Sequence, residues 1–545
     1  MYRRFMLLSL VVFSTLAVGF APANVAFAQR EQPLAVPEFT PRAPIGSDFV
    51  FTQEFNPTSE VGAFAGWSVD IDGNVAVVGA PGETIDGNVG SGAVYIYRRT
   101  FTPAPAWTLE QKLTLASPAP PGLVDGIDYR GFGISVAVDG TKLVVGAPGS
   151  EQLTVRHGSA FFYEDIGGTW IYRTHFTVTQ GNFGQQVALD GNYAAVGNPR
   201  QSWIEGAVAQ GGVNLYTFSG ANWAFLQSID PSGETITEHS HFGTGLALDG
   251  ETLLIGQPGW RVDDSIVSAG RVWEFRRGSS GTYDFYRMID APETGTYFNF
   301  GASVDVFDGT FENLYFIGMP KTVSGFSKAF MFADTITDGF ELISVFGEYG
   351  PGNALGFGRT VAIDQQDTLR AVVGGENKLF VLERTGTGKG QPFVVAEELQ
   401  YGSDPSLRFG IDAAIDNYGI HIGASGDDQT VGYSVVVDEY GLGINTGTVQ
   451  ETLEEGDTIF YTVRLTGPPT ANVTVTPAQP FGGSAFGQCD NFSPSLTFTP
   501  ANYASEQAVL ATVVQDTTIE GLHNCTISNN YTSSDPNYYV FLLIG

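Results

Sequence analysis

The feature that most constrains this chain is a short pattern that recurs seven times, with about 55 residues between copies. Repeats of this period that hold several strands each indicate a solenoid or a propeller. Each copy opens with phenylalanine and a small residue, and the opening dipeptides are Phe64-Ala65, Phe132-Gly133, Phe183-Gly184, Phe242-Gly243, Phe300-Gly301, Phe357-Gly358 and Phe409-Gly410.

Every copy has the same internal order, which is clearest in the second one. Residues 131–148, GFGISVAVDGTKLVVGAP, contain two apolar runs joined by Asp139-Gly140 and closed by Gly146-Ala147-Pro148. Asp-Gly between apolar runs is typical of a β-hairpin, because a type I′ turn needs positive φ at both central residues. An alternating strand and an aromatic-led strand, here Trp170–Val178, follow. Four strands per repeat predict one propeller blade.

The seventh copy lacks its fourth strand, and a matching segment stands at the other end of the repeats. Phe49–Phe55 precedes the first copy as Trp223–Ile229 precedes Phe242. We predict that this N-terminal strand completes the last blade, which closes the ring and removes an open edge. A solenoid does not need such a strand. We therefore expect an all-β chain with a seven-bladed β-propeller over residues 47–440.

The two ends of the chain differ from the repeats. Residues 1–28 read as a signal peptide, with Arg3-Arg4, an apolar core and the cleavage pattern Ala26-Phe27-Ala28. Residues 29–46 are predicted to be a Pro-rich linker. No later apolar run is long enough for a membrane span. We expect a secreted, extracellular or cell-envelope protein.

Residues 445–545 show alternation and spacing that suit a β-sandwich. The chain has only two cysteines, Cys489 and Cys525, and both lie in this segment. In an exported protein they plausibly form a disulfide bond, and the alternative is two buried thiols.

The formal net charge is −32 at pH 7. Such a surface repels nucleic acid and anionic membranes, so neither is expected as a partner. The acidity favours solubility over a specific role in cation binding.

The Phe-Gly opening and the Gly-Ala-Pro closing resemble FG-GAP repeats, the units of integrin α-subunit propellers and of many bacterial secreted proteins. The resemblance implies a seven-bladed propeller used in extracellular ligand binding or cell adhesion, although some members sit in enzymes. The tail resembles a Calx-β domain in its Glu454–Asp457, in LTFTPANY at 496–503 and in DTTIEGLH at 516–523.

The Calx-β resemblance implies calcium ligands among the acids of the tail, and no other cofactor is expected. The matching residues are Glu455, Asp516 and Glu520, with Asp535 as a weaker candidate. Gln515 stands where the family has a further acid, and the loss of a charged ligand lowers the expected affinity.

The integrin-type calcium loop, Asp-x-Asp-x-Asp-Gly, has its nearest match in Asp70-Ile71-Asp72-Gly73. We expect these two acids to lie on opposite faces of a strand and not to share a cation. Lone acids before glycine, such as Asp139, are predicted to be turn residues.

No G-x-S-x-G, H-E-x-x-H or P-loop motif occurs in the chain. The favoured function is therefore a non-enzymatic binding or adhesion protein whose loop faces bind protein or carbohydrate ligands. Loop aromatics such as Trp203 and Trp260 are candidate contacts, and the alternative is that they cap blade edges. One alternative is a hydrolase or lyase on extracellular polysaccharide, with two carboxylates converging in the propeller channel. Another is a structural module of a larger surface assembly.

Overall fold

The computed structural model describes part of the chain, and all regular secondary structure in that part is β-strand. The described residues are 49–533 without 101–105, 116–128, 150–156, 180, 201–209, 232–239, 263–267, 294, 296, 321–326, 336–338, 348–355, 365–369, 376, 385–389, 401–407, 417–418, 428–429, 440–441, 446–457, 466–468, 470, 479–488, 504, 506 and 514–527. The predicted signal peptide, 1–28, and the predicted linker, 29–46, lie outside them.

Seven four-stranded antiparallel sheets occupy the repeat region, and we number them as blades 1 to 7 in the order of their first strands. Blades 1 to 3 contain β2 (Ser68–Asp72), β3 (Val75–Ala80), β4 (Ala93–Thr100), β5 (Ala106–Leu113); β6 (Ser135–Asp139), β7 (Lys142–Ala147), β8 (Gly158–Asp165), β9 (Trp170–Val178); and β10 (Val187–Asp190), β11 (Tyr193–Gly197), β12 (Val213–Phe218), β13 (Trp223–Ile229).

Blades 4 to 6 contain β14 (Leu246–Asp249), β15 (Thr252–Gln257), β16 (Arg271–Arg277), β17 (Tyr283–Asp290); β18 (Val304–Asp308), β19 (Glu312–Met319), β20 (Lys328–Thr335), β21 (Gly339–Gly347); and β22 (Thr360–Ile363), β23 (Arg370–Gly375), β24 (Lys378–Arg384), β25 (Phe393–Leu399). Blade 7 contains β26 (Phe409–Asp416), β27 (Gly419–Ala424), β28 (Tyr433–Glu439) and β1 (Phe49–Phe55).

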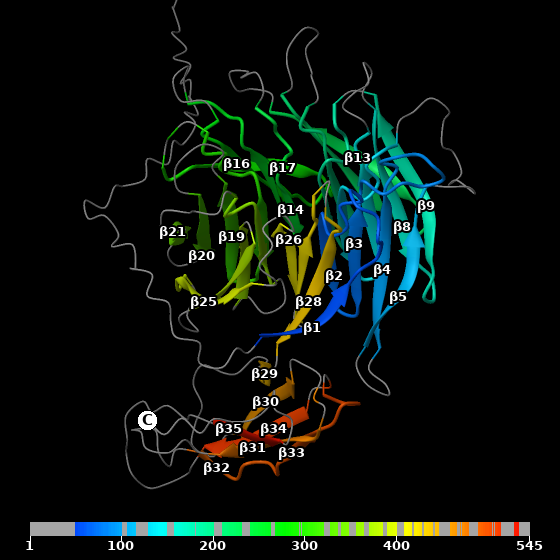
Figure 1. The fold of residues 1–545 in the computed structure, drawn as a ribbon. Helices are drawn as coiled ribbons and strands as arrows, with labels where there is room; N and C mark the ends of the chain where they lie inside the picture. The colour runs from blue at the N-terminus through cyan, green and yellow to red at the C-terminus, as the bar shows by residue number, and fades with distance from the viewer. Residues whose placement is uncertain are drawn as a thin grey trace, which may run out of the picture. The chain divides into compact units, whose positions relative to one another are not determined.

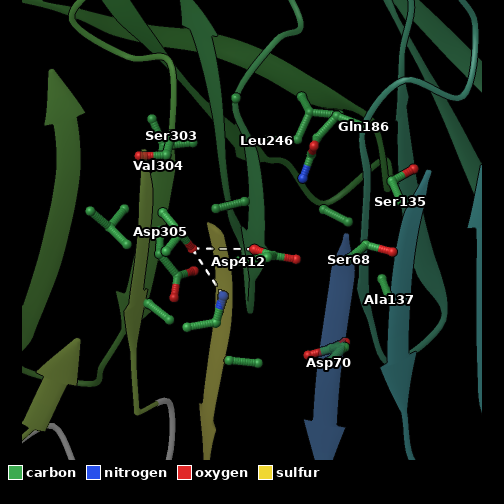
Figure 2. A pocket seen from close by; sticks show the side chains of 18 of the residues that line it. Ser68, Asp70, Ser135, Ala137, Gln186, Leu246, Ser303, Val304, Asp305 and Asp412 are labelled. Atoms are coloured by element: carbon green, nitrogen blue, oxygen red, sulfur yellow. Dashed lines mark hydrogen bonds between the residues drawn. The ribbon is translucent and has the colours of Figure 1, made fainter. Parts of the chain in front are cut away.

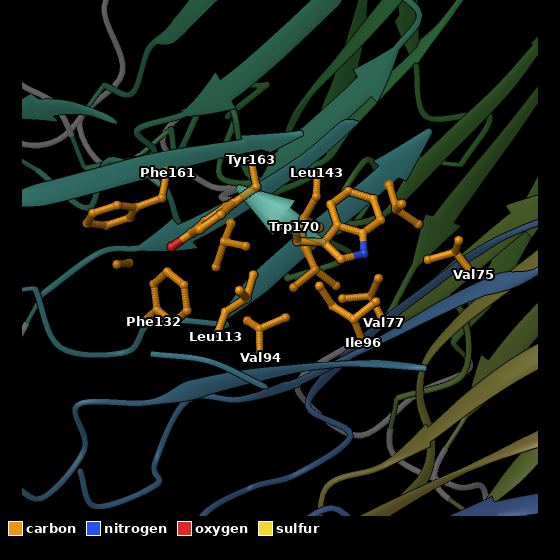
Figure 3. Packing of buried hydrophobic residues seen from close by; sticks show 14 residues of the cluster. Val75, Val77, Val94, Ile96, Leu113, Phe132, Leu143, Phe161, Tyr163 and Trp170 are labelled. Carbon is orange, nitrogen blue, oxygen red and sulfur yellow. The ribbon is translucent and has the colours of Figure 1, made fainter. Parts of the chain in front are cut away.

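The first strands of consecutive blades contact one another, and β26 of blade 7 contacts β2 of blade 1. The sheets therefore form a closed ring, which is the arrangement of a β-propeller (Figure 1). Apolar side chains from neighbouring blades fill the space between them. Val77 and Ile96 of blade 1 pack with Leu143, Phe161 and Trp170 of blade 2 (Figure 3).

The predicted closing strand is confirmed, because β1 pairs antiparallel with β28 as the outer strand of blade 7. In each of the other six blades the pairing of the third and fourth strands contains a bulge, and β1 has one between Phe51 and Gln53. Bulges at sheet edges disfavour edge-to-edge association. The strand from the start of the repeats thus reproduces the geometry of a genuine fourth strand.

The two motif glycines explain why the pattern recurs. A Cβ added to Gly146, the Gly-Ala-Pro glycine of blade 2, would lie 2.0 Å from the carbonyl oxygen of Gly184, the Phe-Gly glycine of blade 3. The same contact closes the ring, where a Cβ on Gly423 of blade 7 would lie 2.1 Å from the carbonyl oxygen of Gly66 in blade 1. Only glycine permits this approach, so the repeated motif is a packing requirement between blades.

This closing contact corrects the predicted motif of the first repeat. Gly66 has a φ of 81°, close to the 91° of the Phe-Gly glycine Gly133. Ala65 is fully buried, as Phe132 is at the corresponding position of blade 2. The dipeptide of blade 1 is therefore Ala65-Gly66, and Phe64 lies one position earlier. The prediction aligned phenylalanine with phenylalanine, whereas the contact between blades selects the glycine.

The C-terminal segment forms two antiparallel sheets, which are consistent with the predicted sandwich. One holds β29 (Leu442–Asn445), β30 (Thr458–Leu465), β34 (Gln507–Val513) and β32 (Cys489–Asp490), and the other holds β33 (Leu496–Phe498), β31 (Val473–Ala478) and β35 (Ser528–Ser533). Cys489 lies in β32, whereas Cys525 lies outside the described residues. The disulfide bond therefore stays a prediction.

Candidate functional site

The acids at the ends of the innermost strands bind the neighbouring blade. Asp72 of blade 1 accepts a hydrogen bond from the Gly140 N–H of blade 2 at 2.6 Å, and Asp416 of blade 7 accepts one from the Gly73 N–H of blade 1 at 2.7 Å. Asp139 likewise accepts from the Gly191 N–H of blade 3. These carboxylates are turn residues, as predicted for Asp139, and each also joins its blade to the next one in the ring.

The expectation that Asp70 and Asp72 lie on opposite faces is wrong. Residues two apart on a strand share a face, and both carboxylates reach blade 2. Asp70 accepts from the Val138 N–H at 2.7 Å, beside the contact of Asp72 with the same hairpin. Backbone N–H groups donate to both acids: Val138 and Gly140 of the next blade, and Ile71 of the same strand for Asp70.

A cavity of about 820 Å³ runs between the innermost strands of all seven blades. Asp70 of β2, Asp305 of β18 and Asp412 of β26 line it (Figure 2). The oxygens of each carboxylate accept hydrogen bonds; for Asp305 the donors are the Val306 N–H at 2.9 Å and the Ile363 N–H at 2.7 Å. The cavity therefore contains acids that the fold already uses.

Burial raises the pKa of these acids above the ordinary value of 3.8, against the opposing effect of their backbone hydrogen bonds. The pKa of Asp305 rises to about 7 and that of Asp412 to about 6. Burial also raises the pKa of Asp249 to about 7. His421 behaves in the opposite way, because burial lowers its pKa from 6.5 to about 4.

These shifts predict that the protein is more stable in mild acid. The three raised acids contribute stability that is complete below pH 3.8 and lost as pH rises through 6 to 7. His421 contributes stability that is complete above pH 6.5 and lost as pH falls toward 4. Its effect therefore offsets that of only one of the three acids. We expect a higher melting temperature at pH 5 than at pH 8. Asp305→Asn should reduce this difference in melting temperature. A higher melting temperature at pH 8 would contradict the raised pKa values of the three acids.

A second hollow, of about 580 Å³, lies on the face formed by the turns around the Phe-Gly and Gly-Ala-Pro motifs, which we call the motif face. Blades 7, 1 and 2 contribute to it. Its lining residues are Phe64, Trp67, Pro81, Gly82, Val89, Gly90, Arg130, Gly131, Ile134, Arg408 and Asp427. We call this hollow the motif-face pocket.

Two of its side chains stand on unusual backbone. The residue before the motif dipeptide has positive φ in six of the seven blades, and glycine, asparagine or histidine fills four of those positions. Phe64 in blade 1 and Arg408 in blade 7 hold the same position at φ of 53° and 52°. Side chains with a Cβ disfavour this region by about 1–2 kcal/mol. Backbone strain that the fold retains at Phe64 and Arg408, in two adjacent blades, indicates a functional role for these residues.

The pocket joins aromatic and cationic groups. The rings of Phe64 and Trp67 meet edge to face with centroids 6.0 Å apart. Arg130 and Arg408 are exposed at its wall. The Arg359 guanidinium, which lines the central cavity, lies 5.8 Å from the centre of the Trp67 ring. In a chain of net charge −32, the lining of this pocket holds two arginines and one acid, Asp427.

Sequence reasoning missed this pocket. The signal was the irregular start of the first repeat, where Phe-Ala-Gly-Trp replaces Phe-Gly, together with arginine at the position before Phe409. Of the predicted contacts, Trp203 lies outside the described residues. Trp260 is stacked by Arg271, whose guanidinium carbon is 3.7 Å from the ring centre.

The predicted calcium ligands Glu455, Asp516, Glu520 and Asp535 all lie outside the described residues. Within the described ranges, no group of three or more histidine, cysteine, aspartate or glutamate side chains could hold a metal ion. The same part of the chain contains no helix that is long and apolar enough to cross a membrane.

Comparisons with known proteins bear on the fold. A family model described as FG-GAP repeat matches residues 60–97 and 107–163, which cover most of blade 1 and reach β8 of blade 2. Among solved structures, the chain is similar to extracellular domains 1–2 of Drosophila Semaphorin 1b, with 9% sequence identity and a TM-score of 0.38. The match covers 71% of this chain and 88% of the semaphorin chain. Nothing about a ligand follows from this likeness. No curated protein matches the sequence. The matched segments and the ring of sheets together identify FG-GAP repeats folded as a β-propeller.

Proposed function

We propose that this protein is an exported, non-enzymatic binding protein and that the motif-face pocket of blades 7, 1 and 2 is its ligand site. The observation that carries the proposal is the retained strain at Phe64 and Arg408, which places an aromatic and a cationic side chain at the pocket wall. Loop faces on a rigid scaffold are common places for binding residues. The predicted signal peptide supports a secreted or cell-surface location, and the resemblance of the repeats to those of integrin α-subunits supports a role in adhesion.

Blocking the pocket tests this function. Val89 is 73% exposed in the pocket, so Val89→Trp should fill the hollow without disturbing the core. We expect ligands found on an array of extracellular glycans and proteins to lose binding to this variant. Val262→Trp is the matched control, because Val262 is 43% exposed on the corresponding loop of blade 4. Ligands that bind the Val89 variant as well as the wild type would place the site elsewhere.

The hydrolase alternative has less support. It needs a pair of carboxylates with oxygens available to substrate, whereas both oxygens of Asp70 and of Asp305 accept backbone hydrogen bonds. A purely structural module does not account for strained side chains at an exposed pocket.

For the tail we propose a Calx-β-like domain that binds calcium through Glu455, Asp516 and Glu520, with Asp535 as a further ligand, and a Cys489–Cys525 disulfide bond. The sequence resemblance supports the first, and the predicted export supports the second. Thermal melts of the whole chain with calcium, with EDTA and with dithiothreitol test both. An unchanged tail transition in all three would refute them.

A further inference from the structure

We propose that the motif-face pocket recognises an acidic glycan, specifically a chain of sugars that carry uronic-acid carboxylates. This inference rests on the proposed function, since it assumes that the pocket is the ligand site, and it adds the chemical class of the ligand. Three features of the lining carry it: its arginines, its aromatic wall and its single acid.

The arginines supply the carboxylate contact. Arg130 comes from blade 2 and Arg408 from blade 7, so the two guanidinium groups approach the pocket from different blades. Arginine binds a carboxylate through two parallel N–H donors, which adds geometry to charge. The net charge of −32 repels anions at long range. Selection for an acidic ligand must therefore come from these local contacts, and salt should weaken them.

The aromatic wall supplies contact area for a ring. Phe64 and Trp67 are both half-buried and lie edge to face at 6.0 Å. Both rings line the pocket together with Arg130 and Arg408, which suits a partner with one apolar face and one polar edge. A sugar ring has this character, with C–H groups on its faces and oxygens on its rim. The volume of about 580 Å³ falls in the usual range for small-molecule sites.

The acid distinguishes a glycan from an acidic peptide. Asp427 lines the same pocket and already accepts a hydrogen bond from the Thr430 hydroxyl at 2.9 Å. The Asp427 carboxylate can accept hydrogen bonds from sugar hydroxyls, which the side chains of an aspartate or glutamate peptide do not offer. Carboxylate, ring face and hydroxyls occur together in a uronic-acid sugar.

Binding of defined oligomers to the full chain tests the proposal. The probes are a 1,4-linked tetramer of uronic acid, the same tetramer with its carboxyl groups reduced to alcohols, and a tetra-aspartate peptide. We expect calorimetry to detect the uronate tetramer alone, with affinity that falls as salt rises. Arg408→Gln and Arg130→Gln should each weaken this binding about tenfold or more, because each removes a charge-assisted contact. Arg261→Gln, on the loop between the second and third strands of blade 4, is the control and should leave it unchanged.

The outcomes separate the two proposals. If the reduced tetramer or the peptide binds as tightly as the uronate tetramer, or if the arginine variants bind it normally, the acidic-glycan assignment is wrong. If the uronate tetramer fails while Val89→Trp still abolishes binding of another array ligand, the pocket is the ligand site and only its chemistry was misassigned. If no ligand responds to Val89→Trp, the proposed function fails as well. Circular dichroism of each variant confirms that it is folded.

Discussion

Replacing Phe55 with alanine is expected to lower the free energy of unfolding by about 3–5 kcal/mol, the cost of removing a buried phenylalanine. Phe55 is 2% exposed at the end of β1. It stacks on Tyr97 of blade 1 at 4.0 Å, and its edge-to-face neighbours are Trp107 at 5.9 Å and His421 at 5.6 Å. The ring therefore joins the closing strand to two blades, and its loss weakens the closure of the propeller.

Urea unfolding followed by circular dichroism measures this effect. The control is Phe225→Ala, which removes the same side chain from the fourth strand of blade 3, where Phe225 is 54% exposed. A much smaller loss is expected there, because little apolar surface is uncovered. Equal losses in the two variants would show that the Phe55 ring contributes no more than an ordinary edge residue.

The second large effect is expected at Glu274. This carboxylate is fully buried between blades 4 and 5, and it accepts hydrogen bonds from the Arg276 Nε at 2.7 Å, the Arg287 Nε at 2.5 Å and the Tyr315 hydroxyl at 3.2 Å. Glu274→Gln leaves two guanidinium groups with Asp334 as their remaining acid in this cluster. Breaking a buried ion pair from one side costs roughly 3–5 kcal/mol.

Asp284→Asn provides the matched control, since it also exchanges a carboxylate for an amide, at an exposed position of β17 in the same blade. Chemical denaturation of both variants should show a loss only for Glu274→Gln. A second variant, in which methionine replaces Glu274 and both arginines, should recover part of the stability. The charge that then loses its arginine partners, on Asp334, is 21% exposed instead of fully buried. A Glu274 variant as stable as the control would mean that the arginines are satisfied by other groups.

Local chemistry explains why the blades could be predicted so closely. The Asp-Gly turn, the alternation of each strand and the bulky residue at the start of the fourth strand act over a few neighbours in the chain. For this reason Trp170–Val178 and Trp223–Ile229 were predicted with the bounds that the structure has. The closing strand could also be predicted, because counting four strands per repeat left one blade short of a strand and one strand without a blade.

Most of the errors and omissions arise where blades meet. Phe64 was assigned to the motif because phenylalanine opens the other repeats. The contact between the Gly66 carbonyl and Gly423 of blade 7, which identifies the motif glycine, exists only in the folded ring. The separation of Asp70 from Asp72 was a local error, because the two-residue period of a strand already places both on one face. What the sequence did not show is that both reach donors on a hairpin that begins about 65 residues later in the chain. The motif-face pocket was missed for the same reason, since its arginines at 130 and 408 become neighbours only when blade 7 meets blade 1.

The sequence alone determined the strands, their order, the number of repeats and the closing role of Phe49–Phe55, because these depend on local turn chemistry and on the period of the repeat. The tertiary structure alone decided what the turn acids bind and which residues line the motif-face pocket. Hydrogen-bond partners and pocket walls come from different blades, and only ring closure brings residues as distant as Phe64 and Arg408 to one surface.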